Sequence, residues 1–191
     1  MIKESKLPEL KMAGARDSKT LTPKQREARL FKIQQLAEDY KAIIVEPKEI
    51  DETLEGGTNL NWLEANKTIE IINELDPDQA IVDCPSPNLR KYKEYLLERL
   101  KNDKIELLTE HRAEKHLPVA AASIIAKVTR DKRIEEIKKK YGNCGPGYVA
   151  NPVTQEFLKK NWEKHPEIFR KSWVTFKNHS AMKQQKKLDE Y

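Results

Sequence analysis

The sequence predicts a layered α/β protein in which helices flank a mixed sheet. Short apolar runs bounded by turn residues alternate along the chain with longer segments whose apolar residues recur at helical spacing. Strands that alternate with helices in this way are typical of a layered α/β fold. No internal repeat is visible, and 191 residues fit one domain with a small appendage.

The first predicted helix begins at Thr22 and Pro23, because Thr is a good N-cap residue and Pro suits the first helical position. Its apolar spacing continues to about Asp39. The apolar and β-branched run at 42–46 then predicts a strand, which Pro47 ends. These two elements begin the alternation.

The rest of the chain continues the alternation. After the turn signal Asp76-Pro77-Asp78, the apolar run at 79–83 predicts a short strand that the following prolines stop. The other predicted segments are, in chain order, a short helical segment at 47–53, helices at 61–75 and 88–101, a strand at 105–109, a long helix at 118–140, a loop at 142–147 and a helix that opens at Asn151.

Asp83 is the last residue of the strand predicted at 79–83. In open α/β sheets, ligands and catalytic groups gather at the carboxyl ends of strands, so this position favours an active-site acid. A loop aspartate that caps a turn explains the same residue equally well. From the residues alone, both interpretations stay open.

Asp131 follows a run of small and apolar residues in the helix predicted at 118–140. Ile124, Ile125 and Val128 lie within about 60° of Ala121 around this helix, whereas Asp131 lies near −80°, at the edge of the apolar stripe. An acid at that edge needs a metal ion, a basic side chain or water beside it. A structural aspartate at a wet helix edge remains the alternative.

The composition favours a polyanionic partner without proving one. Lysine and arginine outnumber the acids by 36 to 31, which gives a net charge of +5 and an isoelectric point near 9.0. Basic residues gather at 138–140 and 183–187, yet such runs are common on solvated faces and in polar tails.

Several other classes of protein are not expected. The chain has no apolar run long enough to span a bilayer and no cleavable signal segment, so we expect a cytoplasmic protein. Cys84 and Cys144 are far apart, which argues against a zinc site and a structural disulfide. The four histidines show no metal-binding spacing, and we interpret them as surface residues.

Residues 118–131, P-V-A-A-A-S-I-I-A-K-V-T-R-D, closely resemble the signature of type 2 ribonucleases H, in particular archaeal ribonuclease HII. Further stretches resemble other motifs of that family, in the same order: R-D-S-K-T-L-T-P at 16–23, I-V-D at 81–83, Y-G-N-C-G-P-G-Y at 141–148 and R-K-S-W at 170–173. Together the similarity covers nearly the whole chain, and it implies a ribonuclease H-like fold.

The sequence departs from the family pattern at its amino-terminal end. The family opens with a strand bearing D-E-A-G-R-G, which supplies two catalytic acids, and these 191 residues contain no such segment. Residues 1–5 resemble the tail of the family's second strand. We therefore expect the amino-terminal strand and most of the next to be absent, through a late start assignment or a truncated gene. A smaller departure is Arg112-Ala113-Glu114, where the family usually has K-A-D.

The resemblance implies an endonuclease that hydrolyses the RNA strand of RNA–DNA hybrids. It assigns Asp83 and Asp131 as two of four acids that hold two divalent ions. Carboxylates without accompanying His or Cys favour Mg²⁺ or Mn²⁺, and two such ions about 4 Å apart commonly serve phosphodiester cleavage. Because two carboxylates alone hold Mg²⁺ weakly, we expect the chain as written to bind metal poorly and to cleave little or nothing.

Four residues are carried over from the resemblance as substrate contacts. Tyr148 matches the tyrosine that packs on a sugar at the RNA–DNA junction, and a core tyrosine after a glycine turn is the alternative. Lys19 matches a lysine expected near a phosphate. Ser123 and Lys127 lie in the signature helix. Lys127 shares a flank with Asp131, where it would meet a phosphate or simply neutralise the acid.

The expected domain organisation is a ribonuclease H-like core at 1–141 and a carboxy-terminal helical extension at 142–191 that carries a substrate-contacting loop. We expect a monomer that acts on nucleic acid and not at a membrane. Two alternatives stay open. One is an inactive relative that still binds nucleic acid through Lys19, Lys127 and Tyr148. The other is a fragment that does not fold stably, because its strands lack a shared partner.

Overall fold

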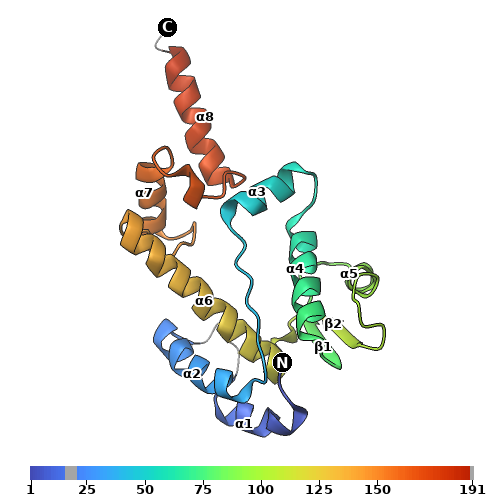
Figure 1. Cartoon of the computed structure of the whole chain (residues 1–191). Helices are drawn as coiled ribbons and strands as arrows, with labels where there is room; N and C mark the ends of the chain where they lie inside the picture. Colours follow the sequence, from blue (N-terminus) through green and yellow to red (C-terminus); the bar gives the residue numbers. More distant parts are fainter. Residues whose placement is uncertain (16–20, 190–191) are drawn as a thin grey trace. The chain divides into compact units, whose positions relative to one another are not determined.

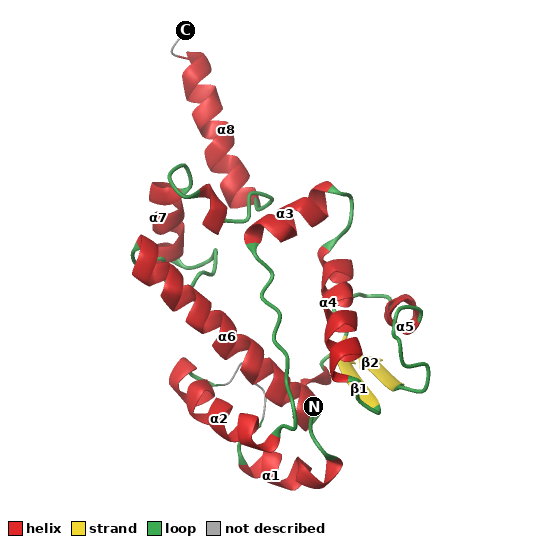
Figure 2. Ribbon diagram, in the orientation of Figure 1, coloured by secondary structure: helices red, strands yellow, loops and turns green. Residues whose placement is uncertain are grey.

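The structure of the chain is a computed structural model that describes residues 1–15 and 21–189, with side chains up to residue 181. Its elements are, in order, η1 (Glu4–Lys6), α1 (Leu7–Met12), α2 (Pro23–Leu36), α3 (Pro47–Glu55), α4 (Leu60–Leu75), β1 (Gln79–Asp83), α5 (Leu89–Leu97), β2 (Glu106–Glu110), η3 (Ala113–Lys115), α6 (Leu117–Tyr141), α7 (Pro152–Asn161), η4 (Pro166–Ile168) and α8 (Val174–Asp189) (Figure 1). The predicted α/β class is confirmed, and Figure 2 shows that helices dominate.

The described chain forms two compact units. The first contains residues 1–43 and 61–130, and the second contains residues 44–60 and 131–191. The division falls inside α6, because the two ends of this 25-residue helix belong to different units. The predicted boundary after residue 141 instead follows the end of that helix, and it stays a prediction.

Helix α2 begins as its sequence predicts. The Thr22 side-chain oxygen accepts a hydrogen bond from the Gln25 N–H at 3.3 Å, and the Gln25 side chain accepts one from the Thr22 N–H at 2.9 Å. This reciprocal capping box satisfies two backbone donors that a helix start leaves without partners. Pro23 follows at the first helical position.

The prediction of a strand at 42–46 is wrong, because the structure has no strand there. Burial does alternate there, with Ile43 and Val45 half-buried and Ile44 exposed, which is the side-chain pattern of a strand. A strand also needs a neighbour for its backbone groups. Within the described residues the sheet contains only β1 and β2, so this extended segment remains without a strand partner.

Residues 1–5 do not continue a strand either. Met1 is joined to the segment after α2: its amino group donates to the Asp39 carbonyl at 2.6 Å, and its carbonyl accepts from the Glu38 N–H at 3.1 Å. The chain then turns into η1 and α1, and Leu10 of α1 is 1% exposed. Burial of this leucine stabilises a helical start where the sequence predicted a strand end.

The first unit holds the sheet. β1 and β2 run parallel, and the register pairs Ala80 with Leu107 and Asp83 with Glu110. The buried side of the sheet packs in one apolar cluster with α4 and α5. Its members are Ala65, Ile69, Ile72, Ala80, Cys84, Tyr92, Leu96, Ile105 and Leu107. Because the register is parallel, the carboxyl ends of both strands meet at one edge of the sheet.

A second apolar cluster in the same unit joins α1 and α2 to the first half of α6. Ala121, Ile124, Ile125 and Val128 of α6 are all buried, which confirms the predicted stripe. They pack with Leu10, Ala15, Leu21, Leu30 and Ile33. The signature helix is therefore held by its small and branched side chains.

The second unit is organised around Asp51 and a group of aromatic rings. Asp51 of α3 is 7% exposed, and its two carboxylate oxygens accept the Lys171 N–H at 2.8 Å and the Ser172 N–H at 3.0 Å. Burial alone raises the pKa of Asp51, but the hydrogen bonds from Ser172 and Lys171 and the charge of Arg170 outweigh it, so the net pKa is lowered. The aromatic group comprises Phe157, Trp162, Phe169 and Phe176.

Candidate active site

Asp83 ends β1 and is exposed, so the predicted position at the carboxyl end of a strand is confirmed. One of its carboxylate oxygens accepts the Ala113 N–H at 3.2 Å. Arg112, just before Ala113, adopts a left-handed backbone with φ +57°. This conformation is costly for a residue with a side chain, and such backbone outliers gather at functional sites. The turn at 112–115 is thus fixed against Asp83.

Glu110 lies opposite Asp83 in the register of the sheet. Its carboxylate pairs with the Lys115 ammonium at 2.7 Å and with the His116 ring. The hydrogen bond from Lys115 lowers the pKa of Glu110 most, burial opposes it, and His116 lowers it further. Next to this pair, the His111 Nδ1 lies 3.0 Å from the Cys84 carbonyl.

From the sequence, Asp83 was expected at this edge of the sheet, but the residues beside it were missed. His111 and His116 were expected at the surface and Glu110 was given no role, although Glu110 ends β2 at the same edge where Asp83 ends β1. The parallel pairing of the two strands was the signal that would have joined them. Glu114 belongs to the same turn, one residue after the N–H that Asp83 binds.

The signature helix presents three of the predicted site residues. Ser123 and Lys127 are half-buried in the first unit, and Asp131, also half-buried, belongs to the second unit. Half-burial of Asp131 agrees with its predicted place at the edge of the apolar stripe. Asp83 and Asp131 belong to different compact units, and their convergence on one metal ion stays a prediction.

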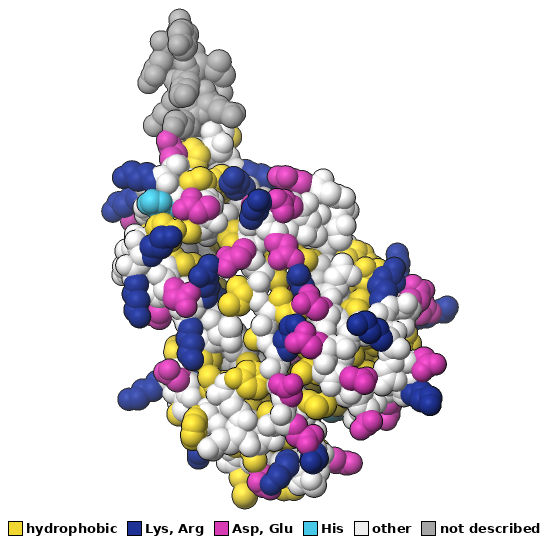
Figure 3. Space-filling view, viewed as in Figure 1, with side chains coloured by type: hydrophobic (Ala, Val, Ile, Leu, Met, Phe, Trp, Pro, Cys, Tyr) yellow, Lys and Arg dark blue, Asp and Glu magenta, His cyan; other side chains and the backbone are white. Residues whose placement is uncertain are grey.

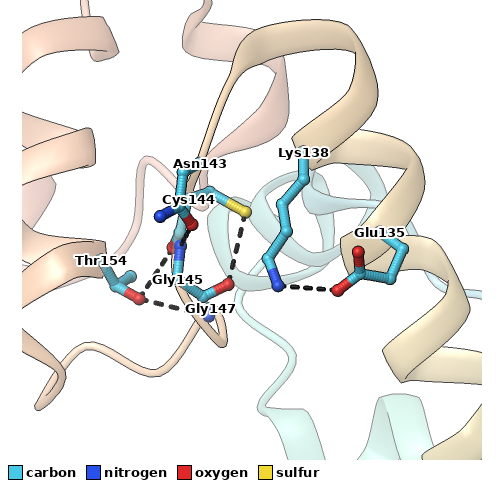
Figure 4. A network of polar contacts seen from close by, with 7 residues as sticks. All are labelled: Glu135, Lys138, Asn143, Cys144, Gly145, Gly147 and Thr154. Carbon is cyan, nitrogen blue, oxygen red and sulfur yellow. Dashed lines mark hydrogen bonds and ion pairs between the residues drawn. The ribbon is translucent and has the colours of Figure 1, made fainter.

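The glycine loop before Tyr148 is built around the Thr154 side chain (Figure 4). The Thr154 hydroxyl donates to the Cys144 carbonyl at 2.9 Å and accepts from the Gly147 N–H at 3.2 Å. Gly145 has φ +64°, and a Cβ added there would lie 2.9 Å from the Thr154 hydroxyl. Glycine is therefore required at this position.

Tyr148 leaves this loop with 56% of its surface exposed. An exposed aromatic ring can stack on a sugar or a base, whereas the alternative of a core tyrosine does not fit that exposure. The Tyr148 carbonyl accepts the Asn151 N–H at 2.9 Å, so the residue is held at the start of α7. Lys19, the remaining predicted contact, lies outside the described residues.

The described residues contain no group of three or more His, Cys, Asp and Glu side chains placed to hold a metal ion. The carboxylates of Asp83, Glu114 and Asp131 suit Mg²⁺ or Mn²⁺ in chemical type, since hard cations prefer oxygen ligands. Within the described residues, however, they are not grouped closely enough to supply three or more ligands to one cation. The described part of the chain therefore lacks a complete set of metal ligands.

Basic side chains are spread over the face of the molecule that Figure 3 shows. On the face drawn in Figure 3, lysines and arginines are interspersed with acidic residues. Several are paired: Arg133 binds Glu46 at 2.7 Å and Glu136 at 2.9 Å, and Lys138 binds Glu135 at 2.7 Å. The net charge of +5 is therefore not gathered into one basic patch on that face.

Among the described residues, no helix has the length and apolar character to cross a bilayer.

A sequence model of the ribonuclease HII family matches residues 1–176. The chain belongs to the ribonuclease HII family. Ribonuclease HII of Thermococcus sibiricus is 39% identical over 183 residues, which cover 93% of this chain and 80% of that protein. The resemblance seen in the signature helix is thus confirmed over almost the whole chain. Ribonucleases HII are endoribonucleases, so the predicted enzyme class is confirmed as well.

Solved structures share the fold. Ribonuclease H2 from Pyrococcus horikoshii OT3 superposes with a TM-score of 0.86 at 36% identity, covering 95% of this chain and 87% of that one. The structure of Bst-RNase HIII in complex with Mn²⁺ gives a TM-score of 0.75 at 16% identity, covering 93% and 61%. The expected ribonuclease H-like fold of this ribonuclease HII is confirmed.

Proposed function

We propose that this ribonuclease HII acts on RNA–DNA hybrids, hydrolysing phosphodiester bonds of the RNA strand with the help of divalent cations. The observation that supports it most is Asp83, exposed at the carboxyl end of β1 and fixed through one oxygen by the Ala113 N–H. Open α/β sheets bind ligands at this edge.

Mg²⁺ or Mn²⁺ is the proposed cofactor. The residues of this chain that would hold it are Asp83 and Asp131, both carboxylates, and a related fold has been solved with Mn²⁺. When bound, such ions lower the pKa of a water nucleophile and stabilise the leaving oxygen. Glu114 is a further candidate ligand, because its turn is attached to Asp83 by a hydrogen bond.

Three substitutions, at Asp83, Asp131 and Glu114, separate these acids, and a fourth is the control. Asp83→Asn is expected to lower hybrid cleavage by at least about 100-fold, more than the loss of an outer-shell partner costs. Asp131→Asn is expected to do the same, and Asp103→Asn, in an exposed turn, serves as the control. Cleavage would be measured with a labelled hybrid and Mn²⁺. A small effect of Asp131→Asn together with a large effect of Glu114→Gln would move the role to Glu114.

The 191 residues contain no D-E-A-G-R-G segment, and we propose that this polypeptide alone cleaves weakly. The variants above are therefore compared in an extended version that carries a strand with this motif. The unextended chain is expected to bind Mn²⁺ weakly, because one or two carboxylates leave most waters on the ion. Equal cleavage by both versions would contradict this part of the proposal.

Substrate contacts are proposed for Lys19, Ser123, Lys127 and Tyr148. The exposure of Tyr148 supports its part, since a ring that is 56% exposed can meet a sugar.

The protein is proposed to act as a monomer in the cytoplasm, with the carboxy-terminal region at 142–191 supplying the substrate loop. An inactive nucleic-acid-binding relative remains the alternative; it predicts hybrid binding without cleavage even in the extended version.

A further inference from the structure

The hydroxyl of Thr154 forms two hydrogen bonds with the loop that precedes Tyr148. It contacts both sides of that loop, donating to the Cys144 carbonyl at 2.9 Å and accepting from the Gly147 N–H at 3.2 Å. Figure 4 shows Thr154 facing the loop from the start of α7. One side chain therefore sets the path of the backbone directly before Tyr148.

Thr154 is itself held firmly. Its own N–H donates to the Asn151 side-chain oxygen at 3.3 Å, which also accepts the Val153 N–H at 3.0 Å. Asn151 thus caps α7 and fixes the first turn of the helix that carries Thr154. The Asn151 N–H binds the Tyr148 carbonyl at 2.9 Å, so the loop is tied to α7 at three points.

The remaining contacts of the loop agree with this arrangement. The Asn143 side chain accepts the Gly145 N–H at 3.0 Å, and Cys144 is buried with 5% exposure. The loop before Tyr148 is therefore packed and hydrogen-bonded, while the Tyr148 ring is 56% exposed. A rigid support under an exposed ring suits a contact that must meet a partner in one orientation.

We infer that Thr154 is a positioning residue for Tyr148, and that its hydroxyl sets how well the enzyme prefers an RNA–DNA hybrid over a DNA duplex. This inference rests on the proposed function, because Tyr148 must contact the hybrid. Thr154 acts through the loop at 144–147 and touches no substrate. Losing its hydroxyl leaves the Gly147 N–H without its acceptor and lets the ring leave its place.

The test uses Thr154→Val, which keeps the shape of the side chain and removes the hydroxyl, and Thr154→Ser, which keeps the hydroxyl. Affinity for a labelled RNA–DNA hybrid and for a DNA duplex of equal length is measured with the 191-residue chain in Ca²⁺. Thr154→Val is expected to lower the preference for the hybrid by about tenfold, the factor that 1.4 kcal/mol gives at 25 °C. Thr154→Ser is expected to retain it.

A double-mutant cycle with Tyr148→Ala shows whether Thr154 acts through the tyrosine. Tyr148→Ala alone is expected to lower the hybrid preference, and adding Thr154→Val to it is expected to change nothing further. Gly145→Ala is a further variant, because its Cβ would lie 2.9 Å from the Thr154 hydroxyl and displace it. It should reduce the preference like Thr154→Val, with thermal melts checking that each variant folds.

If Tyr148→Ala lowers the hybrid preference as expected, three results would overturn the inference. These are an unchanged hybrid preference in Thr154→Val, an equal loss of affinity for hybrid and duplex, or a further loss when Thr154→Val is added to Tyr148→Ala. A neutral Tyr148→Ala would instead refute the proposed substrate role of the tyrosine, and the inference with it. The single variant Tyr148→Ala therefore tells the two failures apart.

Discussion

Asp51 shows at the scale of one residue how a buried charge is kept in the fold. It is 7% exposed, and both of its oxygens accept backbone N–H groups from the R-K-S-W segment. A buried carboxylate is costly unless such partners replace water. The two hydrogen bonds offset this cost, and they attach α3 to the segment that leads into α8.

Asp51→Asn is expected to destabilise the second unit by about 1–3 kcal/mol, because an amide cannot accept two N–H groups through two charged oxygens. Chemical denaturation monitored by tryptophan fluorescence would measure it. Glu52→Gln, on the exposed side of α3, is the matched control and should stay within about 0.5 kcal/mol. An equal effect of both substitutions would show that the hydrogen bonds of Asp51 are unimportant.

The same residue predicts a pH dependence. The pKa of Asp51 in the folded chain lies below its ordinary value, so the unfolded chain takes up the proton first. Its contribution is fully present above the unfolded pKa, which is about 4, and is lost as the pH falls through the folded pKa. Stability measured from pH 7 to pH 3 should fall less steeply in Asp51→Asn than in the unchanged chain.

At the scale of elements, the capping box of α2 is the clearest case of a local signal that decides a boundary. Thr22→Ala is expected to lower the free energy of unfolding by about 0.5–2 kcal/mol, because the Gln25 N–H loses its acceptor. Thr22→Ser keeps the hydroxyl and should retain most of the stability. Thermal melts of both variants measure the difference, and equal melts would show that the cap contributes nothing.

The extended segment at 42–46 gives the opposite case. Its alternating burial resembles that of a strand, but the described structure gives it no strand partner. Its backbone N–H groups are therefore expected to exchange with solvent much faster than those of β1, as a hydrogen-exchange measurement would show. Slow exchange at 43–45 would mean that the segment is paired after all.

These two cases explain how much the sequence could predict. Thr22 and Pro23 act on their own neighbours, so the start of α2 was predictable, as was β1 with Asp83 at its end. The strand at 42–46 depended on a distant partner, which no local pattern reports. Glu110 was missed for the same reason, since the pairing of β1 with β2 sets it opposite Asp83, and His116 was missed with it because it contacts Glu110.

At the scale of the whole molecule, the net charge of +5 favours binding of a polyanion. The face in Figure 3 mixes both signs, and many basic groups are paired, so no single patch explains binding there. Individual cations can instead be tested by their effect on the salt dependence of binding. Each phosphate contact contributes about 0.7–0.9 to the slope of log affinity against log salt.

Lys127 is half-buried on α6, and the salt dependence of binding can test its proposed phosphate contact. If it contacts a phosphate, Lys127→Gln should weaken binding of an RNA–DNA hybrid and reduce the salt slope by about 0.7–0.9, whatever the sequence of the hybrid. Lys159→Gln on the exposed side of α7 removes the same charge and should leave the slope unchanged. Fluorescence anisotropy over a series of salt concentrations measures both. Equal slopes for the two variants would mean that Lys127 serves to neutralise Asp131 rather than to bind the substrate.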